Sequence, residues 1–170
     1  MNAADWSEAT RRVVAEACRP HPDDVVVVVG PEWALVALVA PSVAHVVVVA
    51  PGPAPAAVGA NVSTQANLVP LPERTSMVLV HDELRRREPS AQRTLVADLG
   101  RALPKRGLLV VGDVLWSMPP DQVDEPEQFG ADIGNAPRVA TLEGWLRESG
   151  FLPDTHRFGV GRAVCVALRA

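Results

Sequence analysis

Several residue types are scarce in this 170-residue chain, and each shortage argues against a class of function. There is no tyrosine, aromatic residues make up 4%, and lysine and isoleucine occur once each. Acidic residues outnumber basic ones by 20 to 16, which argues against a nucleic-acid binder that relies on a broad basic surface. The two cysteines, Cys18 and Cys165, lie far apart without metal-ligand spacing around either one. We therefore expect two small buried hydrophobic side chains and no metal site.

The sequence also lacks the marks of export and membrane insertion. Residues 1–6 contain neither a basic start nor an apolar stretch, so no signal peptide is predicted. The most apolar stretch, 33–50, is interrupted by Pro41, Ser42 and His45, and its valine run favours a strand over a membrane helix. These features predict a soluble, cytoplasmic protein without a membrane partner.

Short apolar runs alternate with helical patterns along the whole chain. Four uninterrupted runs predict strands buried on both faces, as in a parallel sheet covered by helices, and they span 25–29, 46–49, 77–80 and 108–111. A weaker strand is expected within 61–71. Helices are expected over 5–20, 32–40, 89–103 and 141–146, the first capped by Asp5 with Glu8 and the last by Thr141.

The C-terminal part predicts a hairpin of two short strands, 155–158 and 163–168, separated by Gly159 and Gly161. Together these elements predict a single domain over 1–170. Its fold class is α/β: a three-layer α/β/α sandwich with a mostly parallel sheet and a C-terminal antiparallel hairpin.

Three segments of the chain carry motifs of one known family. Residues 66–84 (ANLVPLPERTSMVLVHDEL) are similar to that family's acidic loop, LP-x-P turn and fourth strand. Residues 99–113 (LGRALPKRGLLVVGD) resemble its helix, L-K-P-G-G turn and fifth strand, and residues 145–151 (WLRESGF) resemble its last helix and G-F exit. Together they resemble the class I S-adenosylmethionine-dependent methyltransferases, a Rossmann-like family. The resemblance implies the family's fold and, in its complete form, an enzyme that binds S-adenosylmethionine and transfers its methyl group.

The resemblance places the cofactor first at a glycine loop after the first strand. Gly30, Pro31 and Glu32 stand there, with only the first of the family's glycines present, and Val28 takes the place of an acid in the strand. A Cβ is unfavourable where the backbone must approach a ligand closely or adopt a positive φ. A carboxylate at 32 would also repel the cofactor's own carboxylate.

The other two cofactor places follow the second and third strands. Ala50 stands where the family has an acid for the ribose hydroxyls, and each unsatisfied hydroxyl would cost roughly 1–3 kcal/mol. In the family, a residue after the third strand binds the adenine amino group. Here that position falls on Thr64, Gln65 or Asn67, next to Leu68, and an amide oxygen could accept the hydrogen bond. The glycine pattern of nicotinamide-binding proteins and the phosphate-binding P-loop are both absent.

Two residues at the carboxyl edge of the predicted sheet are candidates for catalysis. His81 follows the fourth main strand, where open α/β folds bind ligands, and could act as a base toward a hydroxyl or amine. The alternative is a polar helix start with Asp82 and Glu83 at its N-terminus. Asp113 could orient a substrate together with Trp116; alternatively, Asp113 caps the next turn and Trp116 covers the core.

Other charged segments predict surface rather than chemistry. The run 85–87, three arginines, predicts a solvated helical face or a partner surface. His156 and Arg157 are expected to be exposed in the hairpin. The connection 117–138 is too long for a loop without a function, and it suggests a lid, a docking arm or a contact with a second subunit.

These observations leave several functional hypotheses open. The leading one is a methyltransferase-like domain with a degraded S-adenosylmethionine site, a non-catalytic partner or regulatory subunit of a methyltransferase. Its partner would be the catalytic subunit or a second copy of this chain, with no nucleic acid involved. The alternative is an active S-adenosylmethionine-dependent methyltransferase that acts on a small molecule through a non-consensus cofactor loop. A third hypothesis keeps the pocket for another ligand, such as a nucleoside or an acidic metabolite.

Overall fold

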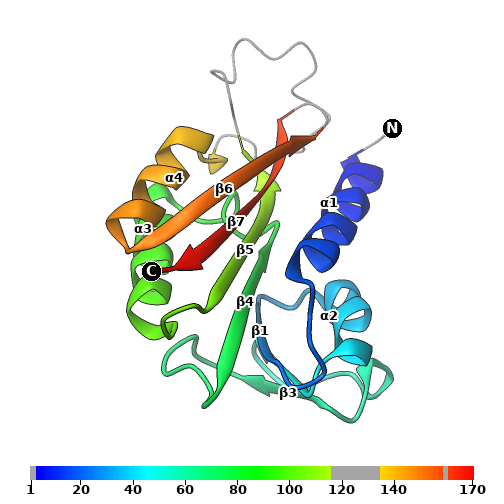
Figure 1. Cartoon of the computed structure of the whole chain (residues 1–170). Helices are drawn as coiled ribbons and strands as arrows, with labels where there is room; N and C mark the ends of the chain where they lie inside the picture. Colours follow the sequence, from blue (N-terminus) through cyan, green and yellow to red (C-terminus); the bar gives the residue numbers. More distant parts are fainter. Residues whose placement is uncertain (1–2, 116–134, 159–160) are drawn as a thin grey trace.

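A single seven-stranded sheet organises the chain (Figure 1). The structure, a computed structural model, describes residues 3–115, 135–158 and 161–170. The sheet order is β3-β2-β1-β4-β5-β7-β6. The first five strands of the chain pair in parallel, while β7 runs antiparallel between β5 and β6. The strands are β1 Val25–Val29, β2 His45–Val49, β3 Val62–Gln65, β4 Thr75–His81, β5 Leu108–Val114, β6 Phe151–Phe158 and β7 Arg162–Arg169.

Helices cover both faces of this sheet and complete the predicted sandwich. They are α1 Ala3–Cys18, α2 Trp33–Val39, α3 Pro89–Ala102 and α4 Val139–Glu148, with short 3-10 turns at Ala40–Ser42 and Ala56–Val58. Successive residues of a strand point to opposite faces, so a valine run can supply both layers. Val27 and Val29 pack with α3 and α4, whereas Val26 and Val28 pack with α1 and α2. The uninterrupted run is therefore explained by a strand with a hydrophobic layer on each side.

Two predicted helix starts are wrong. α1 begins at Ala3, so Asp5 lies within the helix rather than at its N-cap. α4 begins at Val139, two residues before Thr141, and its N-cap residue Arg138 makes no capping hydrogen bond through its side chain. Val139 is only 4% exposed, so packing against the sheet extends this helix beyond the polar residue that was expected to start it.

Both cysteines are buried free thiols, as predicted. Burial raises the pKa of Cys18 to about 12 and that of Cys165 to about 11, so both remain protonated at neutral pH. None of the helices in the described parts of the chain has the length and apolar character needed to cross a bilayer. The predicted lid or docking arm, 117–138, lies mostly outside the described residues.

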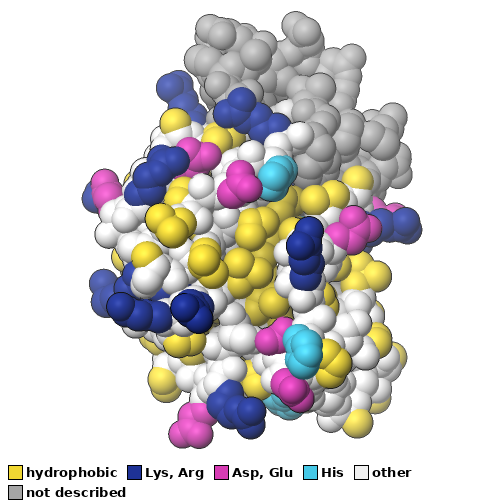
Figure 2. Space-filling model, viewed as in Figure 1, with side chains coloured by type: hydrophobic (Ala, Val, Ile, Leu, Met, Phe, Trp, Pro, Cys, Tyr) yellow, Lys and Arg dark blue, Asp and Glu magenta, His cyan; other side chains and the backbone are white. Residues whose placement is uncertain are grey.

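Two leucines stand exposed beside each other near the edge of the sheet. Leu152 on β6 pairs with Leu168 on β7, and the two side chains are 62% and 43% exposed. They share a face with Leu108 and Val166, which pack at the margin of the α1 and α2 core. Figure 2 shows hydrophobic side chains gathered in the middle of this view of the molecule, with charged side chains of both signs around them.

Candidate functional site

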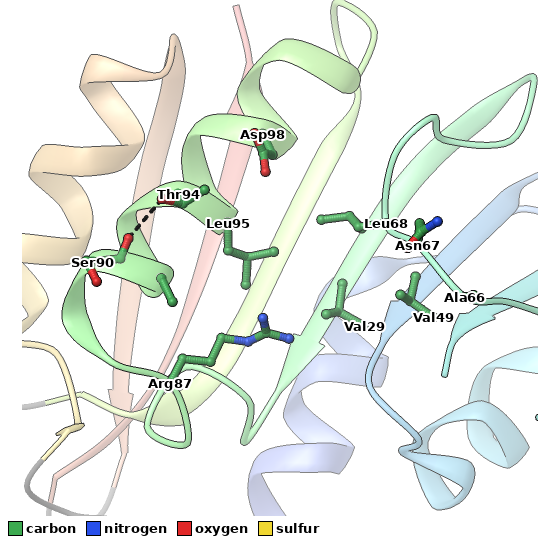
Figure 3. Close-up of a pocket in the computed structure, with 11 residues that line it drawn as sticks. Val29, Val49, Ala66, Asn67, Leu68, Arg87, Ser90, Thr94, Leu95 and Asp98 are labelled. Atoms are coloured by element: carbon green, nitrogen blue, oxygen red, sulfur yellow. Dashed lines mark hydrogen bonds between the residues drawn. The ribbon is translucent and has the colours of Figure 1, made fainter. Parts of the chain in front are cut away.

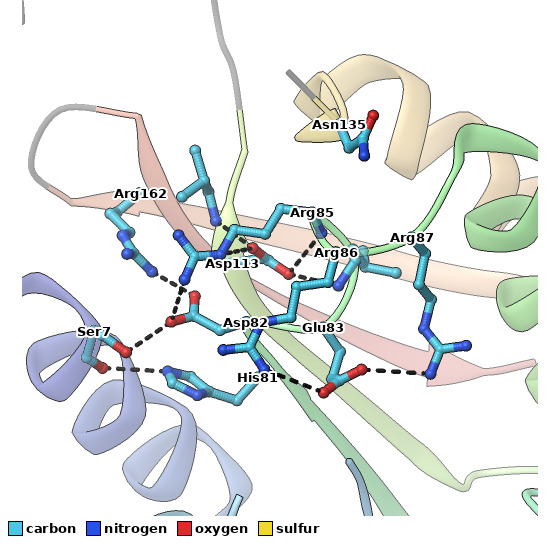
Figure 4. Close-up of polar contacts among 12 residues, drawn as sticks. Ser7, His81, Asp82, Glu83, Arg85, Arg86, Arg87, Asp113, Asn135 and Arg162 are labelled. Carbon is cyan, nitrogen blue, oxygen red and sulfur yellow. Dashed lines mark hydrogen bonds and ion pairs between the residues drawn. The ribbon is translucent and has the colours of Figure 1, made fainter. Parts of the chain in front are cut away.

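The last residue of β4, His81, is enclosed by α1 and by the loop after β1. Its side chain is 0% exposed. Its Nδ1 lies 3.2 Å from Oε2 of Glu32. Its Nε2 lies 3.2 Å from the backbone oxygen of Ser7 (Figure 4). Both ring nitrogens thus face oxygen atoms of the protein itself, and the imidazole holds α1 against the end of β4.

Asp82, the next residue, forms the most deeply buried ion pair among the described residues. Its Oδ1 accepts a 2.6 Å hydrogen bond from Arg162 at the start of β7, and the two residues are 2% and 1% exposed. Its Oδ2 accepts from the Ser7 hydroxyl at 2.7 Å and from Arg85 at 3.2 Å. Burial alone would raise the pKa of Asp82, but the charges of His81 and Arg162, helped by these hydrogen bonds, hold it below the usual value. Asp82 therefore joins α1, β7 and the loop after β4.

Asp113 lies in β5 beside this cluster and is 0% exposed. Its Oδ2 accepts the backbone N–H groups of Leu84 at 2.8 Å and Arg85 at 3.4 Å, while Oδ1 accepts that of Val114 at 2.8 Å. Burial, reinforced by the nearby negative charge of Asp82, raises the pKa of Asp113 to about 6. Asp113 thus shapes the loop after β4 by binding its backbone.

Glu83 turns the opposite way and lies against the loop after β1. Its carboxylate lies 3.4 Å from Arg87 and 3.7 Å from Arg86, and the residue is 9% exposed. A Cβ added to Gly30 would lie 2.7 Å from Glu83 Cδ, and Gly30 itself has a φ of +89°. A glycine is needed at position 30 because of both this backbone conformation and the carboxylate packed against it.

The remaining cofactor positions predicted after β1 and β2 differ in their surroundings. Glu32 pairs with His81 and, at 3.5 Å, with Nε of Arg11. The hydrogen bond from His81, strengthened by the charges of His81 and Arg11, lowers the pKa of Glu32 despite partial burial. Pro31 is exposed, while Ala50 is 4% exposed and belongs to the core beneath α1 and α2.

A cavity of about 520 Å³ opens between α3 and the ends of β1 and β2 (Figure 3). Two of the predicted cofactor positions, Asn67 and Leu68, line this cavity. The other predicted positions do not line it: the cofactor positions Gly30, Pro31, Glu32 and Ala50, and the catalytic candidates His81 and Asp113. The structure therefore separates the predicted site residues into two groups. The cavity is lined by Val29, Val49, Ala66, Asn67, Leu68, Arg87, Ser90, Ala91, Thr94, Leu95 and Asp98.

The prediction of a helical arginine face over 85–87 is wrong, and so is that of a helix start at Asp82 and Glu83. The helix begins only at Pro89, and Arg85 turns inward toward Asp82 with a 12% exposed side chain. Buried carboxylates attract the arginine and hold this segment as a loop. His156 and Arg157 are exposed, as predicted.

Sequence reasoning missed Ser7, Arg11 and Arg162, and it gave Arg87 only as part of a surface run. Arg162 could have been noticed, because it is the one charged residue at the head of the apolar segment 163–168. Ser7 and Arg11 left no comparable signal, since their partners Asp82 and Glu32 are set by tertiary packing.

Comparison with known proteins identifies the fold. No protein-family model and no curated protein sequence matches this chain. Among solved structures, it is similar to the 1,6-didemethyltoxoflavin-N1-methyltransferase of Burkholderia thailandensis, solved with 1,6-didemethyltoxoflavin and S-adenosylhomocysteine. The identity is 17% and the TM-score 0.71, over 97% of this chain and 78% of that one.

Two further neighbours are longer proteins. Human N-acetylserotonin methyltransferase, solved with S-adenosylmethionine, shows 14% identity and a TM-score of 0.72 over 95% of this chain and 52% of its own. The S-adenosylmethionine-dependent methyltransferase SibL, solved in its apo form, shows 20% identity and a TM-score of 0.66 over 96% and 55%. The chain therefore has the class I methyltransferase fold, and it spans little more than half the length of these two neighbours.

Proposed function

We propose that this chain is a methyltransferase-fold protein with a degraded cofactor site that serves as a non-catalytic partner or regulatory subunit of a methyltransferase. The observation that carries the proposal is the carboxylate of Glu83 packed against Gly30. In the family that the sequence resembles, the cofactor approaches the backbone of this glycine loop. A cofactor would here have to displace a buried carboxylate from Arg86 and Arg87.

The neighbouring loop residue supports the same proposal. Glu32 is engaged by His81 and Arg11, so its carboxylate serves an internal ion pair. If the Glu32 carboxylate moved away to make room for a ligand, Nδ1 of His81 would lose its partner, and this side chain is 0% exposed. Breaking a buried polar contact of this kind is costly, which disfavours rearrangement of the loop.

Ala50 adds a second, independent argument. It is 4% exposed, and its backbone N–H is already bonded to Gln65 O at 3.1 Å. Its methyl group can accept no hydrogen bond from ribose hydroxyls. The residues present therefore do not fit S-adenosylmethionine at either the glycine loop or the end of β2.

A non-catalytic role requires a partner, and we propose a catalytic methyltransferase subunit. Leu152 and Leu168 offer paired, exposed apolar side chains of the kind that often marks a protein contact. Asp154, exposed and two residues along β6, and Arg106, exposed beyond the end of β7, supply opposite charges near the pair. The cytoplasmic location expected from the N-terminal sequence stays a prediction, to be checked by cell fractionation.

The test is purification of the tagged chain from its native cells. We expect a methyltransferase to co-purify, and the pair to transfer methyl groups while the chain alone does not. Leu152→Glu with Leu168→Glu should release the partner, whereas Val69→Glu, which changes a residue of 43% exposure in a loop, should not. A monomer that transfers methyl groups alone contradicts the proposal; purification of a dimer of this chain would assign the contact to a second copy.

The alternative is an active S-adenosylmethionine-dependent methyltransferase acting on a small molecule, with His81 or Asp113 near the acceptor. It is favoured by the cavity beside Val29 and Val49 and by the cofactor-bound neighbours. Glu32→Gly combined with Ala50→Asp separates the two cases. The variant should barely improve cofactor binding if the natural loop already works, whereas binding that arises only in the variant supports a degraded site.

A further inference from the structure

The cavity beside α3, called the slot from here on, is lined along one side by residues of this helix. Arg87 lies before the first turn of the helix, and Ser90, Thr94 and Asp98 follow along it (Figure 3). At about 1.5 Å per residue, the helical part from Pro89 to Asp98 covers roughly 14 Å. With a volume of about 520 Å³, the slot falls within the range of small-molecule sites, about 300–1,000 Å³.

Its inner surface is mainly apolar. Val29 and Val49 close it at the ends of β1 and β2, while Leu68 and Leu95 face each other across it. Such a lining favours a ligand with a hydrophobic body, because burial of apolar surface contributes about 25 cal/mol per Å².

One end of the slot carries a cation, Arg87. Glu83 is the single carboxylate shared by Arg86 and Arg87, at 3.7 and 3.4 Å. Both distances exceed the 2.7–2.9 Å or so of a strong charge-assisted hydrogen bond. The side chain of Arg87 is 38% exposed, so its terminal nitrogens are open to a ligand. Figure 3 shows the guanidinium of Arg87 directed toward Val29, so this cation points into the slot.

The other end carries a negative group. Asp98 lines the slot and also pairs with Arg101 on the outer side of α3. A ligand with a second carboxylate at that end would meet Asp98, whereas a ligand with one carboxylate at the Arg87 end would not. The positive charge of Arg87 at one end and the negative charge of Asp98 at the other therefore favour an acid with a single carboxylate, bound with that carboxylate at the Arg87 end.

We propose that this slot binds a small monocarboxylic acid with an apolar body. The carboxylate would accept hydrogen bonds from the two terminal nitrogens of Arg87 in place of Glu83, and the body would lie against Val29, Val49 and Leu95. Arginine suits this role because its planar guanidinium binds carboxylates through two parallel hydrogen bonds. The inference goes beyond the proposed function, since it holds with or without a catalytic partner.

The test uses two ligands that differ only in the charged group, 1-naphthaleneacetate and the neutral 1-naphthaleneacetamide. Each is titrated calorimetrically into the full chain at pH 7.5. We expect the acid to bind with a dissociation constant below about 1 mM and at least about tenfold more tightly than the amide, because the amide has one uncharged acceptor oxygen where the carboxylate has two that share a negative charge.

Three variants locate the binding. Arg87→Gln should weaken the acid about tenfold and leave the amide unchanged. Glu83→Gln removes the internal competitor of the ligand and should tighten the acid by up to about fivefold. Arg86→Gln is the matched control: it removes the same charge from the neighbouring residue, which does not line the slot, and should change the affinity less than about threefold.

Thermal unfolding of each variant verifies that it is folded before titration. Equal affinity for acid and amide would overturn the proposal, as would an Arg87→Gln variant that binds the acid like the natural chain. Absence of binding to both the natural chain and the Glu83→Gln variant at 5 mM acid would overturn it as well. None of these outcomes depends on S-adenosylmethionine, so failure of the slot to bind the acid leaves the proposed function standing.

Discussion

Two regions at the same edge of the sheet have opposite character. Directly after β1 and β2 the chain has small residues, Gly30 and Ala50, and the strands themselves end in Val29 and Val49. At the ends of β4 and β5 the protein buries His81, Asp82 and Asp113. The charged end looks like an active site in the sequence, yet each of these three side chains contacts another part of the protein. A charge cluster at the ligand edge of an α/β sheet can therefore serve to assemble the fold.

Breaking the ion pair at the β4 end should have the largest effect. Arg162→Met leaves Asp82 as a buried carboxylate without its shortest partner, and we expect a loss of about 3–5 kcal/mol in the free energy of unfolding, measured by urea denaturation. Asp82→Asn should recover part of the loss in the double variant, because the uncompensated charge is then absent. A loss below about 1 kcal/mol would show that the pair contributes no more than an exposed one.

A smaller effect is expected at the β1 end. Gly30→Ala forces an L-residue to a φ of +89° and pushes it against Glu83, so we expect a loss of about 3 kcal/mol. Gly144→Ala is the matched control, because this glycine lies within α4 and a Cβ added to it would meet open space. It should stabilise the protein by about 0.5–1 kcal/mol in the same denaturation experiment.

Adding Glu83→Ala to Gly30→Ala separates backbone strain from crowding. Removal of the carboxylate should recover only the crowding part of the loss. Full recovery would mean that the positive φ at position 30 costs nothing and that crowding by the carboxylate alone explains the need for glycine.

The pH dependence of stability distinguishes Asp113 from Asp82. The pKa of Asp113 in the folded state, about 6, lies above its ordinary value of 3.8, so the folded state holds this proton more tightly than the unfolded state. Its contribution to stability is present below the ordinary value and is lost as pH rises through about 6. Asp82 has the opposite sign: its pKa is lowered, so its contribution is lost as pH falls.

Asp113→Asn isolates the first of these contributions. Between pH 4.5 and 7.5 the stability of the natural chain should fall by about 2 kcal/mol relative to the variant, a figure that follows from a shift of about two pKa units. Urea denaturation at several pH values measures it. Parallel pH profiles of the two proteins would show that Asp113 is not the titrating group.

The smallest effect is expected far from both regions. Arg93 and Glu148 pair at 3.0 Å across α3 and α4, with side chains 64% and 61% exposed. Arg93→Ala should change the free energy of unfolding by less than about 0.5 kcal/mol, because solvent already screens the pair. A change as large as that for Arg162→Met would show that burial does not determine how much an ion pair contributes to the stability of this protein.

The fold was more predictable from the sequence than the site. Valine runs such as 25–29 and 46–49 predicted the central strands because local burial on both faces determines that pattern. The polar contacts at the edge join distant parts of the chain, for example Ser7 with Asp82 and Asp82 with Arg162, and no local pattern reports such pairs. The inward turn of Arg85 escaped prediction in part for the same reason: Asp82 is three residues away in the sequence, but Asp113 becomes a neighbour only once β4 and β5 pair.

The function we propose requires that side chains of the protein itself, Glu83 and Glu32, occupy the cofactor place at the end of β1. Calorimetric titration of the natural chain with S-adenosylmethionine and S-adenosylhomocysteine is the direct test of this occupation. We predict no heat of binding at millimolar concentrations of either compound. Micromolar binding, about −8 kcal/mol, would contradict the claim and show that Glu83 and Glu32 give way to the cofactor.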